Sequence, residues 1–178
     1  RHCSELDAEA DRTREITVSV EHLNGIVDKI VSLATFTERE RSQTTMWLSA
    51  LVRDVWEGHP TSSASLTIES DRQIYGYRDA TQLLVEMLVD NAIVHCGRGV
   101  SVVVGETDDG FYVADDGPGI AFDPPARALE PGVTSLDHTA GFGLYIAQQI
   151  ADEQGWVIDV SVSDPGGARF DVTGVESP

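Results

Sequence analysis

Apolar residues change their spacing partway along the chain. Near the N-terminus they recur at alternating steps of four and three, at Ile16, Val20, Leu23, Val27, Ile30 and Ala34. An average period of about 3.5 residues predicts a helix with a coiled-coil seam. The stripe is narrower than a globular core face. This favours one helix of a dimeric bundle over a single amphipathic helix packed on its own domain.

A second helix is predicted over residues 46–57, after a polar break at 37–45. Its apolar positions on one side are Leu48, Leu51, Val52 and Val55. From residue 65 onward the pattern changes to short alternating segments. The expected strands are 65–69, 73–77, 100–106, 111–115, 156–164 and 168–175, and the expected helices are 79–95 and 143–155.

Strands joined as hairpins predict a largely antiparallel sheet, because strands that run in opposite directions need only a short turn between them. The helices would cover one face of this sheet, which gives an α+β domain. We therefore expect a helical arm at residues 1–41 and a mixed domain at residues 42–178. Residues 120–141 show no clear period and are expected to be weakly structured.

The charge of the chain indicates which partners it can bind. The chain has 178 residues, a net charge of −18 and a single lysine, Lys29. It lacks the basic surface that nucleic acid or an anionic membrane requires, so the sequence predicts neither as a partner. An acidic composition this poor in lysine favours a halophile over an acidic mesophile protein.

No apolar run approaches the roughly 20 residues that span a bilayer, and the N-terminus lacks a signal-peptide core. The two cysteines, Cys3 and Cys96, form no CxxC pair. We therefore expect a soluble segment in a reducing cytoplasm. An upstream membrane anchor or sensor domain stays open as an addition to it.

Three short segments carry candidate chemistry. Asn91 interrupts an otherwise apolar helix, and its amide oxygen is a hard ligand that suits Mg²⁺. Asp115 ends a strand in "DDGPG", where a carboxylate accepts hydrogen bonds from an exocyclic amine such as that of adenine. Gly141 and Gly143 lead into a helix whose first N–H groups attract phosphate. The structural alternatives are a surface amide, an ordinary turn and a conformational loop.

The order of these segments resembles the ATP-binding domain of the histidine kinase, gyrase and Hsp90 superfamily, with its Bergerat-type two-layer α/β sandwich. In this comparison "VDNAIVH" is the N box, "DDGPGI" the G1 box, "LEPGVTS" the F box and lid, and "GFGL" the G2 box. The similarity covers roughly residues 45–175. The closing "GGARFDVTGVE" resembles the end of a haloarchaeal sensor histidine kinase.

The resemblance implies a role for each matching residue. Asp115 would bind the adenine amine, directly and through water, and Asn91 would coordinate the Mg²⁺ that bridges the phosphates. Residues 121–140 would form the ATP lid. The other implied ATP-binding residues are His95, Gly117, Gly119, Ile120, Thr134, Gly141, Phe142, Gly143 and Leu144.

Two positions depart from the superfamily pattern. The residue four before Asn91 is usually Glu or Asn, and here it is Met87. Glu86, one place earlier, is the candidate catalytic residue, although one residue is about 100° of helical rotation and would turn it away from the site. The position three after Asn91 is often basic in kinases, and here it is Val94.

The family's phosphoacceptor motif is not matched by His2 in "HCSEL" or by His22 in "EHLNG". The resemblance therefore implies the ATP-binding core of a two-component sensor histidine kinase. It would transfer the γ-phosphoryl group of ATP to a histidine that this chain does not identify, for relay to a response regulator in signal transduction. The alternatives are a catalytically impaired ATP-sensing or dimerisation module and an anti-sigma-type serine kinase. The arm predicts a homodimer.

Overall fold

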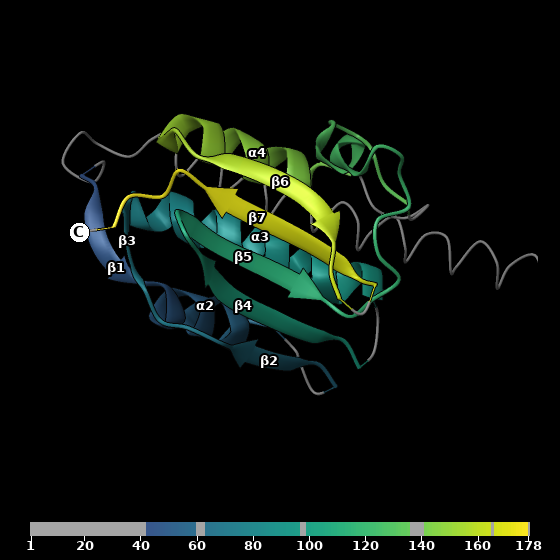
Figure 1. The fold of residues 1–178 in the computed structure, drawn as a ribbon, viewed down its shortest axis with the longest axis horizontal. Helices are drawn as coiled ribbons and strands as arrows, with labels where there is room; N and C mark the ends of the chain where they lie inside the picture. The colour runs from purple at the N-terminus through teal and green to yellow at the C-terminus, as the bar shows by residue number, and fades with distance from the viewer. Residues whose placement is uncertain (1–41, 60–62, 97–98, 136–140, 165, 178) are drawn as a thin grey trace, which may run out of the picture.

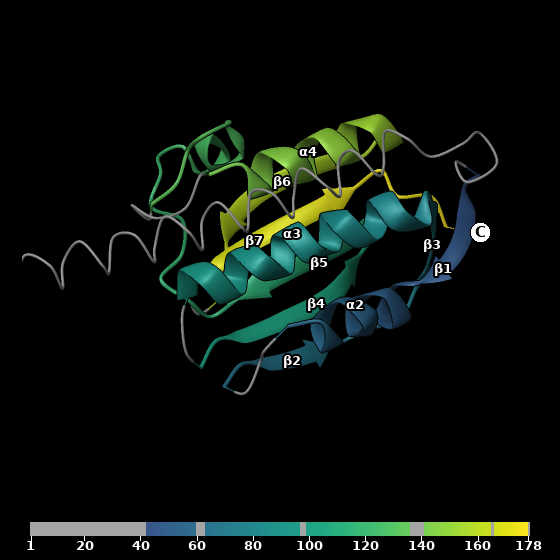
Figure 2. The same ribbon diagram turned by 180° about the vertical axis from the view of Figure 1, so that it is seen from behind.

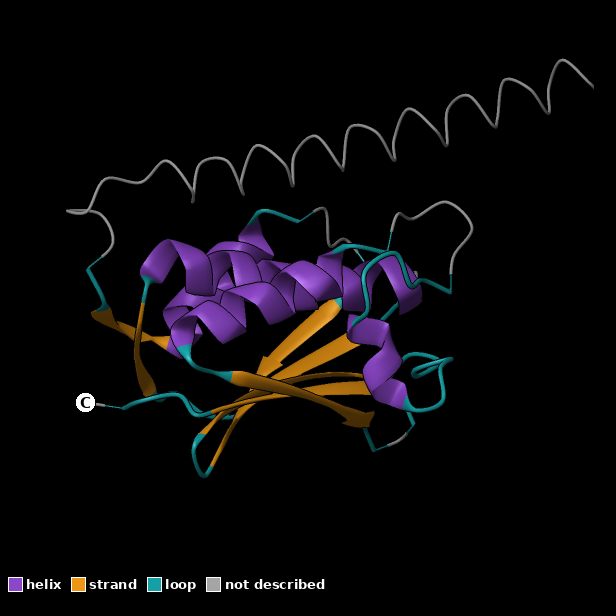
Figure 3. Ribbon diagram, turned by 90° about the horizontal axis from the view of Figure 1, so that it is seen from above, coloured by secondary structure: helices purple, strands orange, loops and turns teal. Residues whose placement is uncertain are grey.

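The computed structural model describes residues 42–59, 63–96, 99–135, 141–164 and 166–177, which form a two-layer α+β domain (Figure 3). Its main sheet has the strand order β2-β4-β5-β7-β6. The pair β2–β4 is parallel, and the other three pairs are antiparallel (Figure 1). The strands are β2 (Ser65–Ile68), β4 (Ser101–Thr107), β5 (Gly110–Asp115), β7 (Ala168–Thr173) and β6 (Val157–Val162).

Three helices cover one face of this sheet (Figure 2). They are α2 (Leu48–Glu57), α3 (Arg78–Cys96) and α4 (Gly143–Gln154). The predicted fold class is confirmed: a mixed, mostly antiparallel sheet with its helices on one face. No helix in the described ranges is long and apolar enough to cross a membrane.

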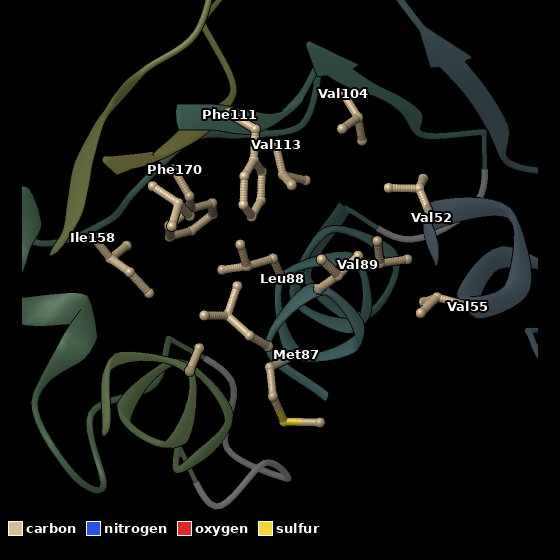
Figure 4. Close-up of a cluster of buried hydrophobic side chains, with 14 of the residues drawn as sticks. Val52, Val55, Met87, Leu88, Val89, Val104, Phe111, Val113, Ile158 and Phe170 are labelled. Carbon is tan, nitrogen blue, oxygen red and sulfur yellow. The ribbon is translucent and has the colours of Figure 1, made fainter. Parts of the chain in front are cut away.

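Helix α3 lies at the centre of the core and is buried on more than one side. Its buried residues are Thr81, Leu83, Leu84, Val85, Met87, Leu88, Val89 and Ala92. Figure 4 shows Leu88 directed toward Phe111 of β5 and toward Phe170, while Val89 faces the side chains of α2. This double burial explains why the helix is apolar around most of its circumference and not along a single stripe.

Strand β7 shows a clear alternation of buried and partly exposed side chains. In β7 the side chains of Phe170 and Val172 are buried against the helices, and those of Arg169 and Asp171 alternate with them on the open face. On that open face the Arg169 guanidinium stacks over the Tyr112 ring, 3.8 Å from its centroid. One face of the sheet therefore packs on the helices and the other carries polar contacts.

One prediction about local structure was wrong and another was incomplete. Residues 46 and 47 were predicted to be helical, but they belong to strand β1 (Thr44–Trp47), which pairs with β3 (Gln73–Gly76) in a separate two-stranded sheet. This pairing is non-local, so helical periodicity alone could not reveal it. The stretch expected to be weakly structured contains a short 3₁₀ helix, η1 (Pro125–Leu129), whose Ala128 and Leu129 are buried.

The end of α4 was predicted correctly. Gly155 follows the last helical residue with φ +75°, and its N–H bonds back to the carbonyl groups of Ala151 and Asp152. The helical arm at residues 1–41 lies outside the described residues, so the division between arm and domain stays a prediction.

Leu88→Ala tests the importance of the α3 core. Leu88 is fully buried between the sheet and the other helices, so the substitution should lower the free energy of unfolding by about 2–5 kcal/mol. Urea denaturation measures this loss. Val94→Ala is the matched control, because Val94 lies on the same helix but is 44% exposed and should change stability by no more than about 0.5 kcal/mol. Equal losses in the two variants would contradict the assignment of α3 to the core centre.

Candidate functional site

Four chain segments meet at one end of the domain (Figure 1). They are the C-terminal ends of β5 and α3, the turn between β6 and β7, and the loop that leads into α4. Sequence reasoning placed candidate residues on three of these segments. The β6–β7 turn is the fourth, and it was predicted only as a hairpin connection.

Asp115 is the buried carboxylate of this end and is 5% exposed. Its Oδ1 atom accepts three hydrogen bonds: from the Gly117 N–H at 2.9 Å, the Ala168 N–H at 3.1 Å and the Cys96 thiol at 3.4 Å. Its Oδ2 atom accepts none from the part of the chain that the structure describes. Because a carboxylate offers about four lone-pair sites, one oxygen is saturated by the protein while the other retains its capacity to accept.

The β6–β7 turn fixes the backbone of Asp115. The Ser163 hydroxyl donates to the Asp115 carbonyl oxygen at 2.6 Å, and Ser163 itself is buried. Gly167 lies so close that a Cβ atom added to it would be 2.0 Å from the same carbonyl oxygen. Sequence reasoning missed both residues. The glycine pair before β7 was the available signal, but it could not show that this turn packs on Asp115.

The glycines of the "DDGPG" segment are required by close packing. A Cβ atom on Gly117 would lie 2.0 Å from the Cys96 sulfur. Gly119 has φ +77°, and a Cβ atom there would lie 2.7 Å from the Gly166 carbonyl oxygen. The next residue, Ile120, is half-buried against the core. The loop after β5 therefore packs tightly against both α3 and the β6–β7 turn.

Asn91 and His95 lie one turn apart on α3, and both are half-buried. The Asn91 amide makes no hydrogen bond with the residues that the structure describes, so its oxygen is available to a ligand. The His95 Nδ1 atom lies 3.2 Å from the Ser135 hydroxyl oxygen. This contact brings the segment that contains Thr134 beside the C-terminal half of α3.

The loop into α4 also depends on glycine. Gly141 has φ +66°, and a Cβ atom on it would be 2.7 Å from the Val133 carbonyl oxygen. The Gly141 carbonyl accepts from the Gly132 N–H at 3.0 Å. Phe142 is exposed and its side chain cannot cap the helix, while Leu144 packs against the core. The first N–H groups of α4, which begins at Gly143, therefore have no side-chain cap from Phe142 and suit an anion.

The structure describes both positions that depart from the superfamily pattern, Met87 and Val94. Met87 is 3% exposed, and its sulfur lies 3.9 Å from where a Cβ atom of Gly143 would be. It therefore packs between α3 and the start of α4, directed away from the sheet (Figure 4). Glu86 is half-buried on the same helix, and Val94 is exposed.

Ionisable groups beside Asp115 differ sharply in their environment. Burial, followed by the neighbouring Asp115 carboxylate, raises the pKa of the Cys96 thiol to about 12. Asp116 is exposed, and its Oδ1 atom accepts from the Ser101 N–H at 2.8 Å, which lowers the pKa of Asp116. Cys96 is therefore a neutral donor at physiological pH, and the Asp116 carboxylate is held by the Ser101 N–H of β4.

Comparison with solved structures gives the same fold. A mycobacterial sensor histidine kinase, MprB, matches with a TM-score of 0.62 at 22% identity, over 76% of this chain and 99% of that chain. The catalytic domain of the histidine kinase ThkA matches with a TM-score of 0.63 at 21% identity, over 77% and 99%. The Acinetobacter baumannii histidine kinase AdeS matches with a TM-score of 0.61 at 20% identity, over 89% and 79%. No curated protein matches significantly by sequence.

A family model identifies the sequence itself. The model described as "Histidine kinase-, DNA gyrase B-, and HSP90-like ATPase" matches residues 76–175, which include all four segments of the site. That range covers more than half of the 178 residues. The chain therefore belongs to the histidine kinase, DNA gyrase B and HSP90-like ATPase family.

Proposed function

We propose that this chain is the ATP-binding catalytic core of a two-component sensor histidine kinase. The observation that carries the proposal is the carboxylate of Asp115. Its Oδ1 atom is held by three protein donors, and its Oδ2 atom is left to accept from a ligand. An acceptor at a buried strand end, beside glycines that permit close approach, suits the amine of adenine.

The phosphate end of the nucleotide would lie at the start of α4. The loop from Gly141 to Gly143 brings N–H groups to this helix end without a capping side chain. These groups attract phosphate through their unsatisfied donors and the helix dipole. Phe142, Gly143 and Leu144 would present these N–H groups, and Thr134 and His95 would flank the nucleotide from the neighbouring segments.

The donor set also fits a magnesium ion that arrives with the nucleotide. The described residues contain no cluster of three His, Cys, Asp or Glu that could hold a metal alone. Magnesium keeps waters and phosphate oxygens in its shell and needs few protein ligands. The amide oxygen of Asn91, which has no partner among the described residues, would be one such ligand and would help to neutralise phosphate charge.

Transfer of the γ-phosphoryl group would then depend mainly on positioning. In-line phosphoryl transfer needs alignment and charge neutralisation more than covalent chemistry from the protein. Residues 121–140 would close over the nucleotide as a lid. The acceptor would be a histidine of a kinase dimer, and a response-regulator receiver domain would receive the group next. Glu86 is our candidate for assisting this step.

A second function is favoured by one observation. Met87 places an apolar side chain between α3 and the start of α4, where the superfamily usually carries Glu or Asn. A chain that binds ATP there but transfers phosphate poorly would act as an ATP-sensing or dimerisation module.

Asp115→Asn should abolish most ATP binding without unfolding the domain. The amide oxygen can replace Oδ1 and accept the three protein donors, which leaves an N–H₂ group facing the adenine amine. A lost hydrogen bond to a charged group costs about 1.5–3 kcal/mol, so affinity should fall at least about tenfold. Titration calorimetry with Mg-ATP measures the affinity.

Asp116→Asn is the matched control, because it makes the same chemical change at the next residue. Its carboxylate is exposed and accepts from the Ser101 N–H of β4, so ATP affinity should stay within about twofold of the parent. If Asp115→Asn bound ATP as tightly as this control, the proposed adenine site would be wrong.

Phosphotransfer is tested on the full-length gene product with ATP labelled at the γ-phosphate and Mg²⁺. The kinase proposal expects label in acid-labile, alkali-stable phosphohistidine and its movement to a receiver aspartate. ATP binding without any phosphohistidine would contradict the kinase assignment and support the ATP-sensing module.

The arm and the composition yield a further test. A coiled-coil seam predicts a homodimer, while a net charge of −18 per chain causes repulsion that salt screens. Light scattering in molar salt should give twice the chain mass, and low salt should favour dissociation, as expected for a haloarchaeal protein. A monomer at micromolar concentration in high salt would exclude dimerisation through the arm.

A further inference from the structure

We propose that Cys96 is a positioning residue for purine recognition, and that its thiol holds the Asp115 carboxylate in the rotamer that selects adenine over guanine. The inference rests on the proposed function, since it concerns the same nucleotide site. Cys96 had no role in the sequence resemblance. Its proposed role follows from its contacts with Asp115 and Gly117 at the end of α3.

Geometry supports a donating role for the thiol. The Cys96 sulfur lies 3.4 Å from Asp115 Oδ1, and a Cβ atom on Gly117 would collide with it at 2.0 Å. The sulfur of this half-buried residue therefore lies between the carboxylate and the loop after β5. The other two donors to Oδ1 are main-chain N–H groups, which makes Cys96 the one side chain among the described residues that donates to this carboxylate.

The protonation state supports the same role. The raised pKa of Cys96, about 12, keeps the thiol protonated throughout the physiological range. A protonated thiol donates to the carboxylate, whereas a thiolate at this distance would repel it. The same property makes Cys96 a poor nucleophile, which argues against a covalent role for it.

Selectivity follows from which oxygen faces the base. With Oδ1 saturated, the carboxylate cannot rotate without breaking several hydrogen bonds, so Oδ2 stays directed at the ligand. Adenine presents its N6 amine as a donor, whereas guanine presents the O6 acceptor at the corresponding position. A fixed carboxylate oxygen therefore accepts from the adenine amine and repels the guanine O6 atom. A carboxylate with fewer restraints could turn or admit water and would discriminate less.

The test measures the affinities of Mg-ATP and Mg-GTP by calorimetry in the parent chain, in Cys96→Ala and in Cys96→Ser. Loss of one net hydrogen bond should weaken ATP binding about three- to tenfold in Cys96→Ala, with little change for GTP. The ratio of the two affinities should therefore fall. Cys96→Ser restores a donor after a small movement at the end of α3, so its ratio should return to within about twofold of the parent.

Folding is checked by circular dichroism and thermal melting of every variant. Cys96→Val supplies a second variant without a donor but with similar volume, in case the alanine substitution leaves a destabilising cavity. A purely structural role would lower the melting temperature and weaken both nucleotides together. Selective loss of ATP affinity with rescue by serine supports the positioning role.

Two outcomes overturn the inference in distinguishable ways. In the first, the parent binds ATP, but folded Cys96→Ala and Cys96→Val keep the parent's ratio of ATP to GTP affinity, or Cys96→Ser shows the same lowered ratio as Cys96→Ala and Cys96→Val. The proposed role of Cys96 is then wrong, and the nucleotide site stands. If the folded parent binds no ATP, the proposed function is wrong and the inference falls with it.

Discussion

The geometry of the site depends on how Asp115 is held. A buried carboxylate is costly unless its charge is satisfied by hydrogen bonds, and here the donors come from three different segments. The N–H of Gly117 belongs to the loop after β5, the N–H of Ala168 to β7, and the thiol of Cys96 to α3. The three hydrogen bonds form together only when sheet, helix and loop are packed as observed. The same packing fixes the direction of the second carboxylate oxygen, Oδ2.

The register of the β5–β7 pair places one of these donors, the Ala168 N–H, beside Asp115. Strands β5 and β7 pair with Ala114 opposite Arg169, which places the N–H of the residue before Arg169 next to the end of β5. Ser163 and Gly167 then close the β6–β7 turn over the Asp115 carbonyl group. A shift of one residue in this pairing would reverse every side chain of β7 and remove these contacts. The hydrophobic alternation that fixes the core thus also fixes the site.

Much of the fold followed from short-range patterns in the sequence. Helix α3, the hairpin strands and Gly155 at the end of α4 were predictable because period, turn residues and caps are local properties. The order of the Asn91, Asp115 and Gly141 segments was sufficient to suggest the family. Strand β1 was not predictable, because its pairing with β3 joins residues far apart along the chain.

Sequence reasoning also missed the residues that support Asp115, for the same physical reason. Ser163 and Ala168 reach it from 48 and 53 residues away, and Cys96 from 19. No local period connects such positions, and none of the three belongs to a short motif that indicates a ligand. Residues that would touch the nucleotide were therefore easier to identify than the residues that orient them.

The two ends of the candidate site are built differently. This difference suggests that ATP binding and phosphoryl transfer would depend on different residues. The proposed adenine end is formed by the end of β5, the end of α3 and the start of β7, which are joined by three hydrogen bonds to one carboxylate. The proposed phosphate end is formed by the loop of Gly132 and Gly141 and by the start of α4, next to the apolar Met87. Local stability follows the density of buried contacts, so the first end is expected to keep its geometry while the second responds to ligand. Substitutions at Met87 would then change the proposed phosphate alignment more than adenine recognition, because the Met87 sulfur lies beside Gly143 at the start of α4. The proposed ATP binding and the proposed phosphoryl transfer would therefore depend on different parts of this site.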